Sequence, residues 1–152
     1  MLAGTEENLL LTLWGRLPCT ARPVNRDRSL EELERGRWPA PPTGATRLVM
    51  TAHALRRRPI GELAVEDMRL LIGQDVGLQY LLPMALEVLR DNPMAEGYMY
   101  AGDLLSAVIT RNPSVWGESA ELRHELRMIV SGLADLPPFI RRDVERFLAA
   151  SR

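Results

Sequence analysis

Histidine and cysteine are the residues best suited to hold a metal ion or to pair as a nucleophile and its base, and this chain of 152 residues has three of them. His53 and His124 fall on different predicted helices, and neither has a His or Cys partner at the spacing that metal ligands use. His124 precedes a glutamate, but the second histidine of the metalloprotease motif does not follow. Cys19 lies upstream of both histidines, so no persuasive nucleophile and base arrangement emerges. We predict no catalytic residue, no metal site and no cofactor.

A loop that carries aromatic and acidic residues is the candidate site for binding another protein. The segment NPMAEGYMYAGD, residues 92–103, contains two of the three tyrosines beside acidic residues. Rigid rings on a loop gain contact area at low entropic cost, which suits an interaction surface. The alternative is that the two tyrosines pack the loop onto the core. The predicted partner-binding residues are Asp91, Glu96, Tyr98, Tyr100 and Asp103.

The charge pattern points in the same direction. The formal net charge is −1, which argues against direct binding of nucleic acid, because that usually requires a basic face. Residues 76–120 contain five acidic residues and two arginines, so this middle segment is acidic. It is suited to face a basic partner, and the alternative is an ordinary solvated surface.

The N-terminal region gives no sign of export or of membrane insertion. Glu6 and Glu7 stand where a secretory signal would be basic, and no apolar run approaches the roughly 20 residues needed to span a bilayer. A single cysteine cannot form an intramolecular disulfide, so we predict a cytoplasmic protein. We expect residues 1–27 to form a weakly ordered leader, with a helix from Glu6 to Trp14 as the alternative, and residues 28–152 to form the folded domain.

Hydrophobic periodicity predicts helices along the whole domain, and no segment alternates with period two over more than four residues. Ser29 and Glu32 form a capping box, and Gly36 supplies a stop, so a short helix is expected over residues 30–35. The fold prediction is an all-α, compact single-domain bundle of six to eight short helices. The other predicted helices cover residues 46–57, 65–74, 78–91 and 119–133, one that Asp103 caps, and a last one that starts at Pro137 and Pro138.

The stretch EDMRLLIGQDVGLQYLLPMALEVL, residues 66–89, is predicted to form the centre of the bundle. Its second helix is apolar almost all round, which is typical of a buried helix. Gly73 and Gly77 allow a sharp turn before this helix. Pro83 is tolerable only in a first turn or at a bend, so the regular helix is expected to begin near Leu82. Glu66 is expected away from the apolar side of the preceding helix.

Two further predictions concern the chain around the predicted helix over residues 46–57. The segment WPAPP keeps residues 38–42 extended, and Trp38 is expected to anchor this crossing onto the core. Arg56, Arg57 and Arg58 fall at the C-terminal end of the helix, where the helix dipole favours cations. We interpret these three arginines as surface residues rather than as a phosphate site.

Several ordered motifs together resemble one protein family. They are SLEELE followed by WPAPP from Ser29, HALRRRPIGELAVEDMRLLIGQDVGLQYLLPMAL from His53, and NPMAEGYMYAGDLL from Asn92. The series is similar to the immunity proteins of bacterial contact-dependent growth inhibition (CDI), and it covers residues 29–110. Two departures are Ala64, where relatives usually have Ser or Thr, and Ala101, where they usually have Pro.

The resemblance implies a function. Such a protein binds the toxic C-terminal domain of a polymorphic toxin, often a nuclease, and neutralises it in the cytoplasm of the producing cell. The family is not thought to have catalytic residues, which agrees with the absence of catalytic motifs. The alternative from the residues alone is a non-enzymatic helical adaptor or regulatory module, either monomeric or homodimeric, and a small enzyme without recognisable motifs is a weaker one. The oligomeric state stays open.

Overall fold

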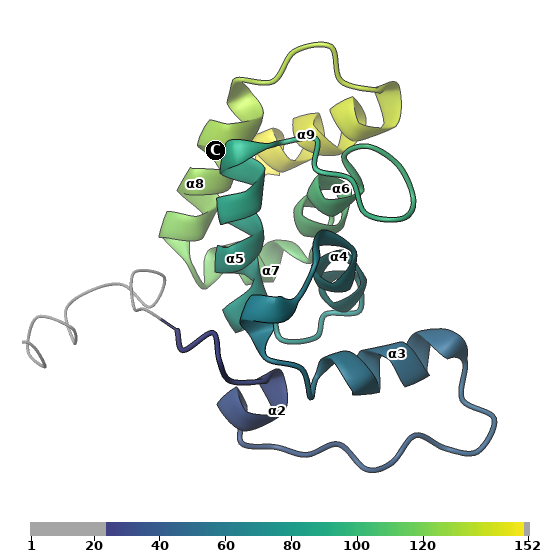
Figure 1. Cartoon of the computed structure of the whole chain (residues 1–152). Coiled ribbons are helices and arrows are strands. Elements are labelled where there is room, and N and C mark those ends of the chain that lie inside the picture. The colour runs from purple at the N-terminus through teal and green to yellow at the C-terminus, as the bar shows by residue number, and fades with distance from the viewer. Residues whose placement is uncertain (1–23, 151–152) are drawn as a thin grey trace, which may run out of the picture.

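Eight α-helices and one 3-10 helix make up the secondary structure of residues 24–150, the part of the chain that the computed structural model describes (Figure 1). No strand occurs in these residues, and one isolated bridge joins Ser29 to Pro59. The predicted all-α fold is therefore confirmed. The elements are α2 (Leu30–Leu33), α3 (Arg47–Leu55), η2 (Ile60–Glu62), α4 (Val65–Gly73), α5 (Leu78–Asp91), α6 (Asp103–Ile109), α7 (Pro113–Gly117), α8 (Ala120–Ser131) and α9 (Pro138–Ala150).

Helix α5 lies at the centre of the bundle, as the sequence predicts. It packs against α4, α6 and α8, while α6 also packs against α4 and α9. Figure 1 shows α5 upright in the middle, with α8 on one side and α4 and α6 on the other. The most buried side chains of α5 have no exposed surface, and they are Leu81, Ala85, Leu86 and Leu89.

The turn before α5 depends on one of the two predicted glycines. Gly77 has a φ of 65°, and a Cβ there would overlap the side chain of Leu30. Gly73 is the last residue of α4 and has no such constraint. The expectation that regular helix begins near Leu82 is wrong, because α5 starts at Leu78 and contains Pro83 as its sixth residue. The proline removes one backbone donor, and the packing around α5 tolerates that loss.

The N-terminal caps of α2, α4 and α7 agree only in part with the sequence predictions. The Ser29 hydroxyl accepts a hydrogen bond from the backbone of Glu32 at 3.3 Å, as predicted. Ala64 provides no side-chain cap, but Asp67 accepts from the Ala64 N–H at 2.9 Å and supplies half of a capping box. Helix α7 was not predicted, although Asn112 accepts from the Ser114 N–H at 3.0 Å as its N-cap.

The segment between α2 and α3 is fastened by an arginine that the sequence analysis placed on the surface. Arg56 is buried, so this interpretation is wrong for it, whereas Arg57 and Arg58 are exposed. The Arg56 guanidinium lies 4.2 Å from the centre of the Trp38 ring and donates to the Gly36 carbonyl at 3.1 Å. Trp38 packs against the core, as predicted.

The predicted leader falls largely outside the described residues. Cys19 and the alternative helix from Glu6 to Trp14 belong to residues 1–23, which the structure does not describe. In the remaining part, Val24 packs against the core, and the Arg26 carbonyl accepts a hydrogen bond from the Gly61 N–H at 2.9 Å. Residues 24–27 are thus attached to the domain.

Candidate functional site

The loop between α5 and α6, residues 92–102, presents large side chains to solvent and is called the display loop below. Tyr98 is 86% exposed, Met99 is 65% exposed and Tyr100 is 38% exposed. A folded domain rarely leaves a large apolar patch exposed to water unless a partner covers that patch. The display loop is therefore the first place to look for a binding function.

Asp103, the first residue of α6, holds the display loop from within. One carboxylate oxygen, Oδ1, accepts a hydrogen bond from the Gly97 N–H at 2.7 Å. The other, Oδ2, accepts from the N–H groups of Met99 at 3.0 Å and Tyr100 at 3.5 Å. These three bonds satisfy backbone donors that a loop of this shape would otherwise leave unpaired.

Two expectations about Asp103 are corrected by these contacts. The N-cap residue of α6 is Gly102, with a φ of 87°, and the Asp103 side chain turns to the loop instead of capping the helix. Asp103 is also only 2% exposed, so its side chain is not part of an accessible surface. Its contribution to binding would be to position the loop.

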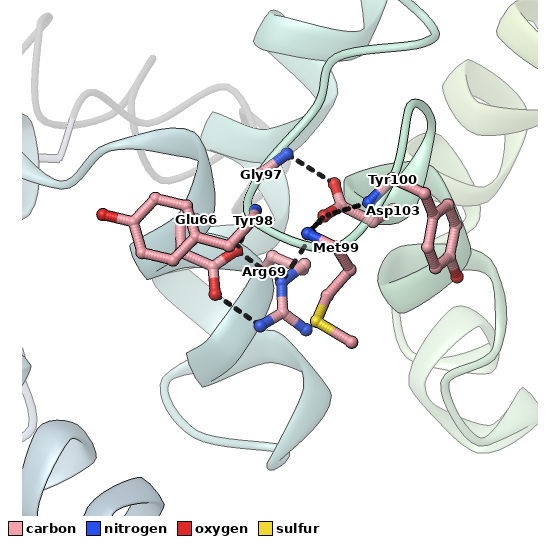
Figure 2. Close-up of polar contacts among 7 residues, drawn as sticks. All are labelled: Glu66, Arg69, Gly97, Tyr98, Met99, Tyr100 and Asp103. Carbon is pink, nitrogen blue, oxygen red and sulfur yellow. Dashed lines mark hydrogen bonds and ion pairs between the residues drawn. The ribbon is translucent and has the colours of Figure 1, made fainter.

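Glu66 on α4 holds the same loop from a second direction. Its Oε2 accepts a hydrogen bond from the Tyr98 N–H at 2.8 Å, and the residue is 8% exposed. Arg69, one turn later on α4, donates to the Glu66 carboxylate at 2.6 Å from Nε and lies 3.7 Å from Asp103 Oδ2. Figure 2 shows Glu66 and Arg69 on the α4 side of the loop and Asp103 on the α6 side. We call Glu66, Arg69 and Asp103 the ion cluster.

Glu66 and Arg69 both stay charged at neutral pH. The hydrogen bond from Arg69 lowers the pKa of Glu66 below its ordinary value, with a smaller contribution from the Tyr98 N–H, and these effects outweigh the opposing effect of burial. The hydrogen bond to Glu66 raises the pKa of Arg69 in turn. One arginine thus faces two carboxylates, and its charge offsets part of theirs in a site with little access to water.

Gly97 marks how closely the loop approaches these carboxylates. A Cβ at this position would overlap Glu66 Oε2 and would come within 3.0 Å of Asp103 Oδ2. Only glycine allows the backbone to lie this near to the ion cluster. The loop conformation therefore depends on residue 97 as much as on the two acids.

The two tyrosines of the display loop point in opposite directions, as Figure 2 shows. The Tyr100 ring meets Phe139, at the start of α9, edge to face, with 5.1 Å between ring centres. Tyr98 extends away from α9 and is far too exposed to anchor the loop on the core. The alternative that both tyrosines pack inward therefore fails for Tyr98 and is only partly met by Tyr100.

The acidic character of this region is weaker than the sequence suggests. Asp91 and Glu96 are both exposed, and neither has an ion-pair partner among the residues that the structure describes. Glu87 instead pairs with Arg26, and Asp103 lies beside Arg69. The negative charge available to a partner thus comes mainly from Asp91, the last residue of α5, and from Glu96 within the loop.

A groove of about 780 Å³ between α3 and α4 continues the exposed surface, and Tyr98 lines it. Leu48 and Met50 form its apolar wall on α3, and both are substantially exposed. On the opposite side Asp67 lies 3.6 Å from Arg58, so the charges at that edge are paired. We call this feature the α3–α4 groove.

The remaining chemistry-bearing residues lie apart from this surface. His53 packs edge to face against Trp38, and His124 is exposed on α8. Within residues 24–150, no group of three or more His, Cys, Asp or Glu side chains is placed to hold a metal ion. No helix in the same part of the chain is long and apolar enough to cross a membrane.

A comparison with known protein families identifies the family of this chain. A family model described as CDI immunity proteins matches residues 32–126, which is more than half of the chain. The chain belongs to the CDI immunity protein family. The resemblance seen in the sequence is thereby confirmed, and the matched region extends beyond it into α8. No curated protein matches the chain.

The matched region contains the whole site of this CDI immunity family member. It runs from α2 to the middle of α8 and so includes the ion cluster, the display loop and both walls of the α3–α4 groove. Helix α9, which carries Phe139, lies outside it. Sequence reasoning found the exposed tyrosines but missed Glu66, because a glutamate in the first turn of a helix is fully explained by the helix dipole. Nothing in the neighbouring sequence indicates that the Glu66 carboxylate accepts a hydrogen bond from a loop residue 32 positions later.

Proposed function

We propose that this CDI immunity protein binds the C-terminal domain of its cognate toxin, a nuclease domain by expectation, and neutralises it in the cytoplasm of the producing cell. Membership of the family supports the immunity role. The protein acts by binding, with no catalytic step of its own. The display loop and the α3–α4 groove form the proposed contact surface.

The observation that carries this assignment is the fixed position of exposed residues. Ordering a loop backbone costs roughly 1–2 kcal/mol per residue in conformational entropy. Here four consecutive N–H groups, from Gly97 to Tyr100, are held by Glu66 and Asp103, and the side chains so ordered include two that contribute nothing to the core, Tyr98 and Met99. A partner that meets a preformed loop does not have to supply that ordering energy.

The residues of the surface have different proposed roles. Tyr98 and Met99 are the apolar anchors, and the α3 wall of the groove extends them. Asp91 and Glu96 lie on the rim, where unpaired acids attract a basic partner such as a nuclease. Asp103 supports the loop from beneath. Tyr100 is shared between the surface and its contact with Phe139.

The test compares two methionines of equal exposure. Met99 on the display loop is 65% exposed and Met128 on α8 is 64% exposed. The affinity of the full chain for the toxin domain encoded beside it is measured by calorimetry for the wild type, Met99→Ala, Tyr98→Ala and Met128→Ala. We expect losses of about 1–3 kcal/mol for Tyr98→Ala and Met99→Ala and no change for Met128→Ala.

The outcomes test the immunity function and the proposed contact surface separately. No binding by the wild type would refute the immunity assignment. Tight binding by the wild type with equal affinity in all three variants would keep the function and reject the display loop as its contact. Protection of growing cells that express the toxin domain gives the same comparison in vivo.

A further inference from the structure

A second cavity, of about 230 Å³, lies where α6, α7, α8 and α9 meet, and none of the display-loop or groove residues lines it. Its apolar lining includes Ile109, Trp116 and Phe147. The Trp116 and Phe147 rings meet edge to face with 5.7 Å between their centres, so this wall is well packed. We call it the α9 cavity.

Four charged residues also line the α9 cavity, and one of them is fully occupied. Arg111 donates to Asp75 at 2.8 Å and to the carbonyls of Ala107 at 2.7 Å and Gly73 at 3.2 Å. This arginine ties α6 to the end of α4, so its presence at the cavity has a structural explanation.

The other three charged residues have no such explanation. Arg123, Asp143 and Arg146 line the cavity, and none of them has an ion-pair partner in residues 24–150. Two arginines and one aspartate leave a positive charge in excess in the cavity lining. Arg146 is exposed and Arg123 is half-buried, and both border an apolar recess.

The location of Arg123 is unfavourable for the helix that carries it. It is the fourth residue of α8, close to the N-terminal end where the helix dipole is positive and where acidic side chains are preferred. The N-cap there is Ser119, whose hydroxyl oxygen accepts from the Leu122 N–H, so Arg123 contributes nothing to capping. A cation at this end that forms no ion pair in residues 24–150 raises the positive potential of the cavity.

Trp116 adds a hydrogen-bond donor with nothing to bind. Its side chain is 4% exposed, and its Nε1 is buried without a hydrogen-bond partner in the described part of the chain. Buried indole N–H groups normally find an acceptor, because leaving one unpaired is destabilising. Trp116 lines the cavity, so its unpaired N–H is the donor on this wall that a bound acceptor could satisfy.

We propose that the α9 cavity binds a small organic monoanion: a carboxylate on an apolar body, with the carboxylate at Arg123 and Arg146 and the body against Trp116 and Phe147. Guanidinium groups match the geometry of a carboxylate. Asp143 on the same wall opposes a second negative charge, which disfavours a dianion such as phosphate. The volume is below the roughly 300–1,000 Å³ of drug-sized sites, so the ligand is small.

The test follows the indole N–H of Trp116 by nuclear magnetic resonance while benzoate is added to the full chain at constant ionic strength. The resonance is assigned with Trp116→Phe. We expect a saturating shift with a dissociation constant on the order of 1 mM. Arg123→Ala and Arg146→Ala should each weaken benzoate binding about tenfold. Arg142→Ala is the matched control, because Arg142 is exposed on α9 and does not line the cavity.

Each alternative outcome rejects a stated part of the proposal. No saturating shift, or an equal shift with chloride, would overturn the site. Unchanged affinity in both Arg123→Ala and Arg146→Ala would overturn the assigned anchors. Inorganic phosphate that binds as tightly as benzoate would overturn the choice of a monoanion with an apolar body. Toxin affinity does not enter any of these measurements, so the result is independent of the immunity role.

Discussion

The carboxylate of Glu66 accepts a hydrogen bond from the backbone N–H of Tyr98, 32 residues later in the chain, at 2.8 Å. This bond connects a helix of the bundle directly to the most exposed aromatic residue of the display loop. Asp103 makes the matching connection from α6. The exposed surface is therefore an extension of the packed helices rather than an independent loop, and changes in the ion cluster should reach it.

Gly97→Ala tests how tightly the loop is fitted to the ion cluster. The added methyl group would overlap Glu66 Oε2, so the loop must move away and the bonds to Glu66 and Asp103 are strained or broken. We expect a loss of about 2–3 kcal/mol in the free energy of unfolding, measured in urea, and weaker toxin binding. The exposed side chains are unchanged in this variant, so weaker binding would come from their positions.

Gly73→Ala is the control for that substitution. Gly73 ends α4, and a Cβ there meets no atom within 4 Å. Alanine in a helix is about 0.5–1 kcal/mol more favourable than glycine, so this variant should be equally stable or more stable. Equal effects of the two substitutions on stability and binding would show that the close approach at Gly97 has no special importance.

The lowered pKa of Glu66 predicts a loss of stability in acid. A carboxylate whose pKa is lower in the folded state stabilises the fold above its unfolded value, here 4.5, and loses that contribution as the pH falls through the folded value. Glutamine at position 66 cannot ionise, so the Glu66→Gln variant should be less stable than the wild type by about 2 kcal/mol at pH 7. The difference should shrink as the pH falls below 4.5.

Urea unfolding of the wild type and Glu66→Gln from pH 7 to pH 3 measures this effect. Native-state exchange of the Tyr98 amide hydrogen reports the same bond locally, and the amide should exchange faster in the variant. A stability difference that stays constant across the pH range would mean that ionisation of Glu66 does not stabilise the fold.

The helices could largely be predicted because their signals are local. Ser29 and Glu32 stand at the spacing of a capping box, and the apolar run of α5 identifies the buried helix whatever its neighbours are. Pro83 misled the prediction because the cost of one missing hydrogen bond was weighed without the packing that surrounds α5. Asn112 before Pro113 was a readable start signal for α7 that was overlooked.

The interior of the site could not be predicted because its contacts are not local. Glu66 has the same sequence setting as any acid in the first turn of a helix, and only the fold brings the display loop to it. Asp103 likewise resembles a helix cap until the loop is seen to fold back over it. The exposed residues Tyr98 and Tyr100 were identified because chemical type, rather than distance in space, singled them out.

Arg56 and Arg57 are neighbours with opposite environments, which makes them a matched pair for stability. Arg56 is buried, stacks on Trp38 and donates to the Gly36 carbonyl, whereas Arg57 is exposed. We expect Arg56→Ala to lower the free energy of unfolding by about 2–3 kcal/mol, through lost packing against Trp38 and the lost hydrogen bond to Gly36. Arg57→Ala should change it by less than about 0.5 kcal/mol. Equal urea midpoints for the two variants would contradict a structural role for Arg56.

The last prediction separates the location of negative charge from its amount. Asp91, at the end of α5, and Glu96, within the display loop, are exposed and unpaired. Glu118, directly after α7, is an exposed acid outside the loop. If the loop meets a basic toxin domain, Asp91→Asn with Glu96→Gln should slow association about three- to tenfold at low salt, with little effect on dissociation. Glu118→Gln should leave both rates unchanged.

Stopped-flow association at two salt concentrations measures these rates. Salt should slow the wild type and reduce its advantage over the double variant, because the attraction acts over about 10 Å at 0.1 M ionic strength. If Glu118→Gln slowed association as much for each charge removed as the double variant does, net charge alone would matter and the display loop would not be where the acids act. No slowing in any variant, combined with large losses for Tyr98→Ala, would mean that recognition rests on the apolar anchors.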